Sequence, residues 1–123
     1  MQKYYFYDNG ILNLFLINRE SKLLENLVAI YLLRKYGEGL FYYNRNVEVD
    51  FYIPSEQLGI QVSYSTADLE TRKRETSALV KLNAFRTLKR SLIITYNEEK
   101  LITVNGQTIE VVPVWRWMLE KEP

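Results

Sequence analysis

Residues 47–65, VEVDFYIPSEQLGIQVSYS, consist of two segments of alternating apolar and polar residues joined by a short polar connection. Alternation of this kind is typical of strands with one buried face, so the stretch predicts two neighbouring β-strands. In the first strand, Glu48 and Asp50 share the face opposite the odd-numbered apolar residues. In the second strand, Gln61 and Ser63 share a face. If the strands pair, these four side chains project to the same side, within reach of one ion.

The segments on either side of this stretch predict two long helices. Residues 21–36 are apolar around most of the helix circumference, so we expect a helix that Ser21 caps and that is buried between layers. Residues 65–85 predict a second helix that begins at Ser65 or Thr66. Its long charged face indicates that it packs on the outside of a sheet.

The remaining segments complete an α/β pattern. Residues 39–44 (GLFYYN) predict a strand, and the apolar run 91–96 (SLIITY) is typical of a strand in the middle of a sheet. The pair Asn105-Gly106 predicts a hairpin turn between two further strands. A short helix then starts at Pro113 and is expected to bury three side chains, Trp115, Met118 and Leu119. The order αβββαβ, followed by a hairpin and a helix, indicates an α/β fold with a mixed sheet and flanking helices.

The chain length bounds the domain organisation. A chain of 123 residues allows a single hydrophobic core, so residues 1–123 are expected to form one domain. Residues 3–7 are expected to form a short strand or extended arm, and residues 10–17 a helical turn or loop. Because the sequence starts abruptly on this aromatic, packed-looking segment, we expect it to be a fragment of a longer protein.

The composition excludes several classes of function. The sequence has neither cysteine nor histidine, which excludes thiol nucleophiles, histidine-based triads and Cys/His zinc sites. Any metal would sit on oxygen ligands, which favours Mg²⁺ or Mn²⁺. Sixteen basic and fifteen acidic residues give a net charge of +1, so nucleic-acid binding would need a local basic patch. The lack of cysteine, of a secretory signal and of an apolar run of about 20 residues favours the cytoplasm without membrane contact.

The expected order of elements resembles the PD-(D/E)XK nuclease superfamily, which has an acid on the first helix and the pattern D-x(n)-(E/Q)-x-K across two strands. More narrowly, the whole chain resembles the uncharacterised C-terminal domain that follows the ATPase module in many prokaryotic AAA-type ATPases. Five segments carry this resemblance: KYYFYDNGIL, LLENLVAIYLLRKYG, VEVDFYI, IQVSYS and IEVVPVWRWML. The resemblance implies a restriction-endonuclease-like core and, as a partner, an ATPase module in the same chain. No P-loop pattern, G-x-x-x-x-G-K-[ST], occurs here, so ATP binding and hydrolysis would belong to that N-terminal module.

The resemblance also implies positions for a nuclease site. Glu25 falls at the first-helix acid and Asp50 at the metal-binding aspartate, while Gln61 falls at the second acid and Ser63 at the lysine. In active members the acids hold Mg²⁺, which generates the attacking hydroxide, and the lysine balances charge. Gln61 still offers an oxygen, so Asp50 and Gln61 would hold magnesium if any binds. Ser63 supplies no positive charge, and the four positions are therefore interpreted as vestigial.

Another cation could replace the missing lysine. Arg72, Lys73 and Arg74 lie early in the second expected helix, and Lys81 lies two turns further on. The alternative interpretation of the run TRKRET is a solvated helix face. If the domain contacts nucleic acid, neutralising Arg72 and Lys73 should weaken binding at low salt.

Three functions from different classes remain. The first is a catalytically degenerate nuclease-like domain that serves an AAA-type ATPase as an interaction or nucleic-acid-contacting module. The second is an active Mg²⁺-dependent nuclease with a substituted site, against which the joint loss of the second acid and the lysine weighs. The third is an oligomerisation or partner-binding domain with no nucleic-acid role, which the near-neutral charge favours. The degenerate module is the expected function, and under it Asp50→Ala should leave stability nearly unchanged.

Overall fold

The computed structural model describes residues 19–44 and 47–120, and the expected N-terminal arm (3–7) and turn (10–17) lie outside them. The helices are α2 (Arg19–Tyr36), α3 (Leu69–Phe85) and α4 (Val114–Leu119), with short 3₁₀ helices η1 (Gly37–Gly39) and η2 (Pro54–Glu56). The strands are β1 (Phe41–Asn44), β2 (Glu48–Ile53), β3 (Leu58–Val62), β4 (Arg90–Thr95), β5 (Lys100–Val104) and β6 (Gln107–Pro113). In this part of the chain they form one six-stranded mixed sheet, in the order β1-β2-β3-β4-β6-β5. The predicted α/β fold with a mixed sheet and flanking helices is confirmed.

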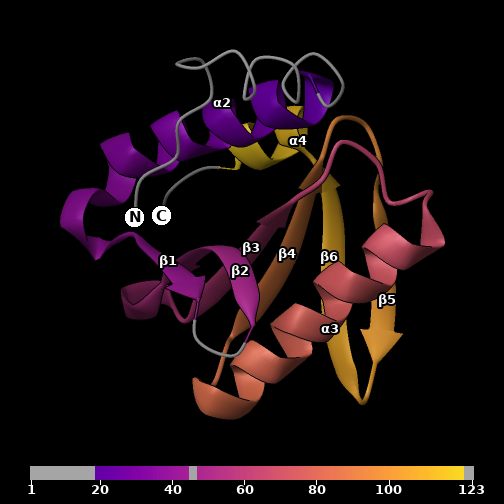
Figure 1. Ribbon diagram of the computed structural model, residues 1–123. Helices are drawn as coiled ribbons and strands as arrows, with labels where there is room; N and C mark the ends of the chain where they lie inside the picture. The colour runs from indigo at the N-terminus through magenta and orange to yellow at the C-terminus, as the bar shows by residue number, and fades with distance from the viewer. Residues whose placement is uncertain (1–18, 45–46, 121–123) are drawn as a thin grey trace.

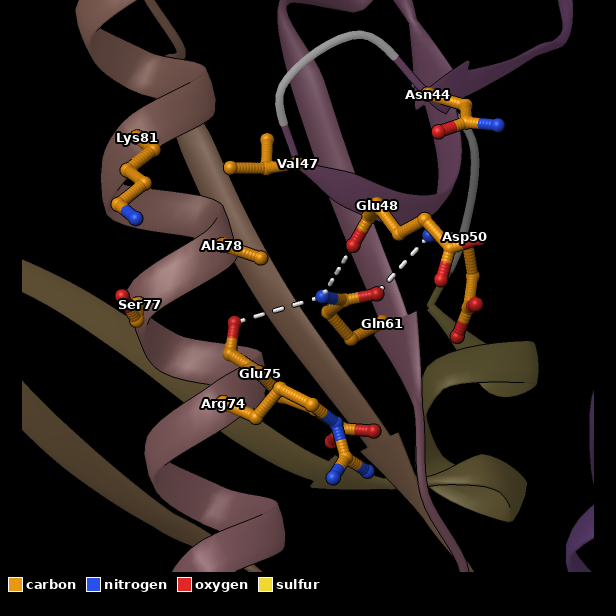
Figure 2. A pocket seen from close by; sticks show the side chains of 10 residues that line it. All are labelled: Asn44, Val47, Glu48, Asp50, Gln61, Arg74, Glu75, Ser77, Ala78 and Lys81. Atoms are coloured by element: carbon orange, nitrogen blue, oxygen red, sulfur yellow. Dashed lines mark hydrogen bonds between the residues drawn. The ribbon is translucent and has the colours of Figure 1, made fainter.

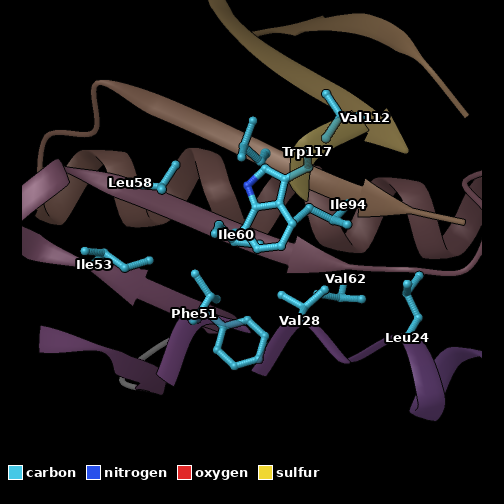
Figure 3. Close-up of a cluster of buried hydrophobic side chains, with 12 residues drawn as sticks. Leu24, Val28, Phe51, Ile53, Leu58, Ile60, Val62, Ile94, Val112 and Trp117 are labelled. Atoms are coloured by element: carbon cyan, nitrogen blue, oxygen red, sulfur yellow. The ribbon is translucent and has the colours of Figure 1, made fainter. Parts of the chain in front are cut away.

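The sheet is covered by helices on both faces. In Figure 1, α2 and α4 lie along one face and α3 lies across the other. On the first face, apolar side chains of α2, such as Val28, pack against Phe51 and Ile60 of the sheet and against Trp117 of α4 (Figure 3). On the second face, Leu79 and Leu82 of α3 pack against the central strands. The two clusters give the sheet a buried core on each side, and β4 is buried along nearly its whole length.

The predicted alternation in β2 is wrong at one point. Phe41 of β1 pairs with Tyr52, but Tyr43 pairs with Val49, so two residues of β2 lie opposite one residue of β1. An extra residue of this kind is a β-bulge, and it changes which side chains share a face. Val49 and Tyr52 accordingly both belong to the α3-side cluster, whereas Phe51 lies in the α2-side cluster. The bulge falls at Asp50, which places this acid at an irregular point of the sheet.

Both long helices begin elsewhere than predicted. Ser21 lies inside α2 instead of capping it. The cap of α3 is Asp68, whose carboxylate accepts the backbone N–H of Thr71 at 3.0 Å, and not Ser65 or Thr66. Asp68 satisfies an N–H that the first turn leaves without a partner, which stabilises the helix start by about 1 kcal/mol.

The burial predicted for α2 is only partly correct. One side of the helix carries buried residues, including Leu24 and Val28. The opposite side carries a row of apolar side chains that are 42–56% exposed: Leu23, Leu27, Ile30 and Leu33. The helix therefore packs by one face on the sheet, and its second apolar face is exposed.

The C-terminal part agrees with the sequence in its elements but not in its buried residues. Asn105 and Gly106 have φ of 51° and 79° and form the two-residue turn between β5 and β6, as predicted. In α4, Trp117 is buried and Met118 is half-buried, whereas Trp115 and Leu119 are exposed, contrary to the prediction. No helix within 19–44 and 47–120 is both long enough and apolar enough to cross a membrane.

Candidate functional site

A pocket of about 550 Å³ lies between the bulged end of β2, the end of β3 and the middle of α3 (Figure 2). The absence of a side chain at Gly59 lets α3 approach β3 closely beside it, since a Cβ there would meet Leu79 and Leu88 at 3.1 Å. The pocket is lined by Asn44, Val47, Glu48, Asp50, Gln61, Arg74, Glu75, Ser77, Ala78 and Lys81. Polar side chains of β2 and β3 therefore meet charged side chains of α3 at this pocket.

The Gln61 side chain spans the gap between β2, β3 and α3. Its Oε1 accepts the backbone N–H of Asp50 at 2.9 Å, and its Nε2 donates to the backbone C=O of Glu48 at 3.2 Å. The same Nε2 lies 3.5 Å from the backbone C=O of Glu75 on α3. Gln61 is only 4% exposed. Its amide, with a donor and an acceptor, thus acts as a structural bridge to the main chain of two elements.

Asp50 completes the same bridge from the other strand. Backbone pairing between β2 and β3 extends from Ile53↔Leu58 to Phe51↔Ile60. Beyond that point side chains replace the ladder, because Asp50 Oδ2 accepts the backbone N–H of Val62 at 2.9 Å. Where the pocket opens, the two strands are therefore joined by two side chains instead of by backbone pairs. Asp50 therefore stabilises the sheet here, contrary to the expectation that Asp50→Ala leaves stability nearly unchanged.

Glu75 is the acid that the sequence analysis did not single out. It lines the pocket from α3, and its Oε1 is buried without a hydrogen-bond partner among the described residues. Burial and the negative charge of Asp50 raise the pKa of Glu75 from 4.5 to about 8, although Arg74 acts in the opposite direction. Glu75 is therefore protonated in the folded protein at neutral pH. Its position could have been found from helical spacing, since it lies four and seven residues before Leu79 and Leu82, which pack on the sheet.

Glu48 belongs to a second hydrogen bond at the rim of the pocket. Tyr42 of β1 donates its hydroxyl to Glu48 Oε2 at 2.6 Å. Burial and this hydrogen bond raise the pKa of Tyr42 to about 12, with a smaller contribution from the charge of Asp50. One oxygen of the Glu48 carboxylate is thus used in a hydrogen bond to β1.

The structure brings only part of the predicted site together. Asp50 and Gln61 line the pocket, as do Arg74 and Lys81 among the cations considered as replacements for the lysine. Glu25 is buried in α2, which covers the face of the sheet opposite α3, and it does not line the pocket. Arg72 and Lys73, which lie on the same helix as Arg74, line a different groove.

Ser63 also lies outside the pocket, in a loop that is fixed by other contacts. Its hydroxyl donates to the backbone C=O of Ser65 at 2.8 Å. Glu98, in the connection between β4 and β5, accepts hydrogen bonds from this loop: from the hydroxyls of Ser65 and Thr66 and from the Thr66 backbone N–H. Burial opposes ionisation of Glu98, but these hydrogen bonds hold its pKa below the ordinary value. Ser63 is therefore part of the packing at the end of β3.

The donors around the pocket fit a magnesium ion poorly. The Gln61 oxygen already accepts a hydrogen bond, one Asp50 oxygen does the same, and Glu75 holds a proton at neutral pH. Within residues 19–44 and 47–120, no group of three or more acidic side chains is arranged to hold a metal ion. A hard cation would have to displace a proton and at least one hydrogen bond.

No protein-family model, curated protein or solved structure gave a significant match to this chain. Function is consequently inferred from the site and from the sequence resemblance.

Proposed function

We propose that this chain is a catalytically degenerate domain of the PD-(D/E)XK nuclease type that serves an AAA-type ATPase as an accessory or interaction module. The observation that carries the proposal is the state of Gln61, which stands where the second acid would be. Both polar atoms of its amide are bonded to the main chain of β2: Oε1 accepts the N–H of Asp50, and Nε2 donates to the C=O of Glu48. A group held in this way ties the strands together and presents no free charge to a metal.

The element order supports a restriction-endonuclease-like core. The chain runs α2-β1-β2-β3-α3-β4, with β1 to β3 antiparallel and β4 parallel to β3. Asp50 and Gln61 lie where β2 and β3 separate, beside the helix that connects β3 to β4. The association with an ATPase module, and with it full-length ATP binding, rests on the sequence resemblance. The absence of cysteine from the sequence supports a cytoplasmic location.

Thermal unfolding with and without millimolar Mg²⁺ or Mn²⁺ tests the loss of the metal site. A cation that binds the folded state must raise its stability by mass action. We expect no shift in the melting temperature of the wild type at neutral pH. Asp50→Ala should melt lower by an amount equivalent to about 1–2 kcal/mol, because Val62 N–H loses its acceptor.

Asp50→Asn is the matched control, since an amide oxygen keeps the acceptor for Val62 without the charge. A rise of several degrees in the melting temperature with Mg²⁺ that disappears in Asp50→Asn would contradict the proposal that the metal site has been lost. It would favour an active nuclease in which Lys81 or Arg74, both at the pocket, takes the place of the lysine. Cleavage of labelled DNA would then be the next measurement.

A domain for oligomerisation or partner binding is a second candidate, which the exposed face of α2 favours. Leu23, Leu27 and Ile30 follow one another at helical spacing on that face and are 42–46% exposed. Monomeric proteins rarely expose a contiguous apolar row of this length without a function for it. The row lies on the opposite side of the sheet from the pocket, so it could bind a partner whatever the state of the pocket.

Under this second function, the wild-type chain should associate at micromolar concentrations, and Leu27→Asp/Ile30→Asp should be monomeric. If two copies of the chain associate through this row, the aspartates of both copies would bring like charges into an apolar interface. Size-exclusion chromatography with light scattering measures the mass directly. Phe85→Asp, which places the same charge on an exposed apolar site of α3, should leave the mass unchanged. A wild type that stays monomeric throughout would remove self-association from consideration.

A further inference from the structure

A second groove of about 480 Å³ lies at the far edge of the sheet, between the first turns of α3 and β5. It is lined by Leu69, Arg72, Lys73, Thr76, Lys100, Leu101, Ile102 and Val104. Three of these side chains are cationic and none is acidic. Leu69 and Leu101 are 62% and 70% exposed, so the groove also offers apolar surface. Figure 1 shows β5 at the edge of the sheet, on the side covered by α3.

The strand that forms one wall of this groove is an open edge. Within the described residues, β5 ends the strand order, with β6 as its neighbour. In a hairpin with a two-residue turn, the residues that flank the turn exchange both backbone hydrogen bonds, so Val104 and Gln107 form such a pair. Alternation along β5 then directs the main chain of Ile102 and Lys100 to β6. The N–H and C=O groups of Leu101 and Thr103 are directed to the open edge, where a further strand could pair with them.

Side-chain alternation places the cations of the groove next to such a strand. Lys100, Ile102 and Val104 share the face of β5 under α3, because Ile102 packs with the α3-side cluster. Arg72 and Lys73 approach the same face from α3. An extended segment beside β5, about 5 Å away, would present every second side chain to this cationic wall. The complementary sequence has acidic residues at those positions, with apolar residues between them that face Leu101 on the other side of β5.

We propose that this groove binds an acidic, extended peptide segment of a partner protein, which adds to the sheet as a strand beside β5. Main-chain hydrogen bonds from Leu101 and Thr103 supply affinity, and Arg72, Lys73 and Lys100 select acidic side chains. The charge argues against a second copy of this chain in the groove, because two such edges would bring like-charged lysines and arginines together. The exposed leucines argue for a peptide rather than for a phosphate backbone. The proposal goes beyond the accessory function and does not depend on the state of the pocket at Gln61.

Fluorescence anisotropy with the folded chain tests the proposal. The probe is a fluorescein-labelled peptide in which glutamate alternates with valine, compared with a lysine–valine peptide and with labelled single- and double-stranded DNA. We expect saturable, salt-sensitive binding of the glutamate–valine peptide alone. Arg72→Glu/Lys73→Glu should weaken it about tenfold or more, because like charges would then face each other. The matched control Arg86→Glu/Lys89→Glu makes the same charge change at exposed positions of the chain outside the groove and should bind like the wild type.

Thr103→Pro tests the strand addition separately from the charge. Proline removes the N–H that Thr103 directs to the open edge and leaves the ladder to β6 intact. With circular dichroism confirming the fold, this variant should lose the peptide, whereas Thr103→Val should keep it. The proposal is overturned if the wild type does not bind the acidic peptide or binds the lysine–valine peptide equally. Unchanged binding in Arg72→Glu/Lys73→Glu or in folded Thr103→Pro overturns it as well. Binding of DNA alone, or self-association that Thr103→Pro abolishes without peptide binding, would assign the groove to another occupant.

Discussion

Glu75→Gln is expected to raise the free energy of unfolding by about 4 kcal/mol at pH 8 and to change it little at pH 4. The pKa of the Glu75 carboxyl is raised from 4.5 to about 8 by burial and by the charge of Asp50. A difference of this size between the folded and unfolded states corresponds to about 4–5 kcal/mol. Since the free energy of unfolding of a single domain is only about 5–15 kcal/mol, ionisation of this one carboxyl would remove a large fraction of it.

The sign of the pH dependence follows from which state holds the proton more tightly. With its pKa raised, Glu75 keeps its proton in the folded protein over a range where the unfolded chain has released it. The contribution of Glu75 to stability is therefore greatest below about pH 4.5, falls as pH rises through the window from 4.5 to about 8, and is lost above it. The usual carboxylate, with a lowered pKa, gives the opposite slope. Asp68 and Glu98 are such groups, and their effect lies at lower pH.

Urea denaturation of wild type and Glu75→Gln between pH 4 and pH 9 measures this effect. Glutamine keeps the shape of the side chain and removes the ionisable group, so the slope between pH 4.5 and 8 should disappear in the variant. Glu70→Gln, on an exposed position in the first turn of the same helix, is the matched control and should retain the wild-type slope. Parallel curves for wild type and Glu75→Gln would mean that Glu75 is solvated and that the pocket is polar and open.

The same measurement bears on metal binding. Burial and the charge of Asp50 raise the Glu75 pKa. A divalent cation beside Asp50 would offset that charge and would replace the Glu75 proton. The wild-type stability at pH 8 would then increase with Mg²⁺, and its slope with pH would flatten. If stability at pH 8 does not respond to Mg²⁺ while Glu75→Gln is strongly stabilised, the pocket holds a buried carboxyl beside Asp50 and binds no cation that offsets its ionisation.

The sequence alone could predict the elements whose signals are local. The alternation in β3, the apolar run of β4 and the Asn105-Gly106 turn all depend on neighbouring residues, and all three were predicted correctly. The bulge at Asp50 was missed because it arises from the pairing of β1 with β2, which the residues of β2 do not encode by themselves. The error in α4 has a similar cause, since Trp117 rather than Trp115 is turned to the sheet by the direction in which the chain leaves β6.

The candidate site was predictable in its position but not in its chemistry. The polar faces of the two strands correctly placed Asp50 and Gln61 together. Glu75 carried a weak signal in its spacing from Leu79 and Leu82, which the run of charges around it obscured. That Gln61 uses its whole amide on the main chain follows from the separation of β2 and β3, a tertiary feature with no sequence signature. The resemblance to nucleases, taken alone, would have assigned that amide to a metal.

Gln61→Leu is expected to lower the free energy of unfolding by about 3 kcal/mol. Leucine has a similar volume, so the main loss is polar: Asp50 N–H and Glu48 C=O would lose their partners at a partly buried place. Each buried group without a partner costs about 1–3 kcal/mol. Because these bonds hold the strands where backbone pairing has stopped, the pocket should also lose its shape. The effect should appear as a lower urea midpoint with an unchanged m-value.

Two comparisons separate a bridge from a simple buried polar residue. Ser63→Ala removes one hydroxyl hydrogen bond to Ser65 at the end of the same strand, and it should cost only about 1 kcal/mol. Gln61→Glu keeps the acceptor for Asp50 N–H but turns the donor into a second acceptor, facing the C=O groups of Glu48 and Glu75. It should therefore destabilise at least as much as leucine at neutral pH, and protonation at low pH should restore part of the loss. A Gln61→Leu variant within 1 kcal/mol of the wild type would show that the two main-chain groups find other partners, and the side chain at position 61 would then be free to serve a ligand.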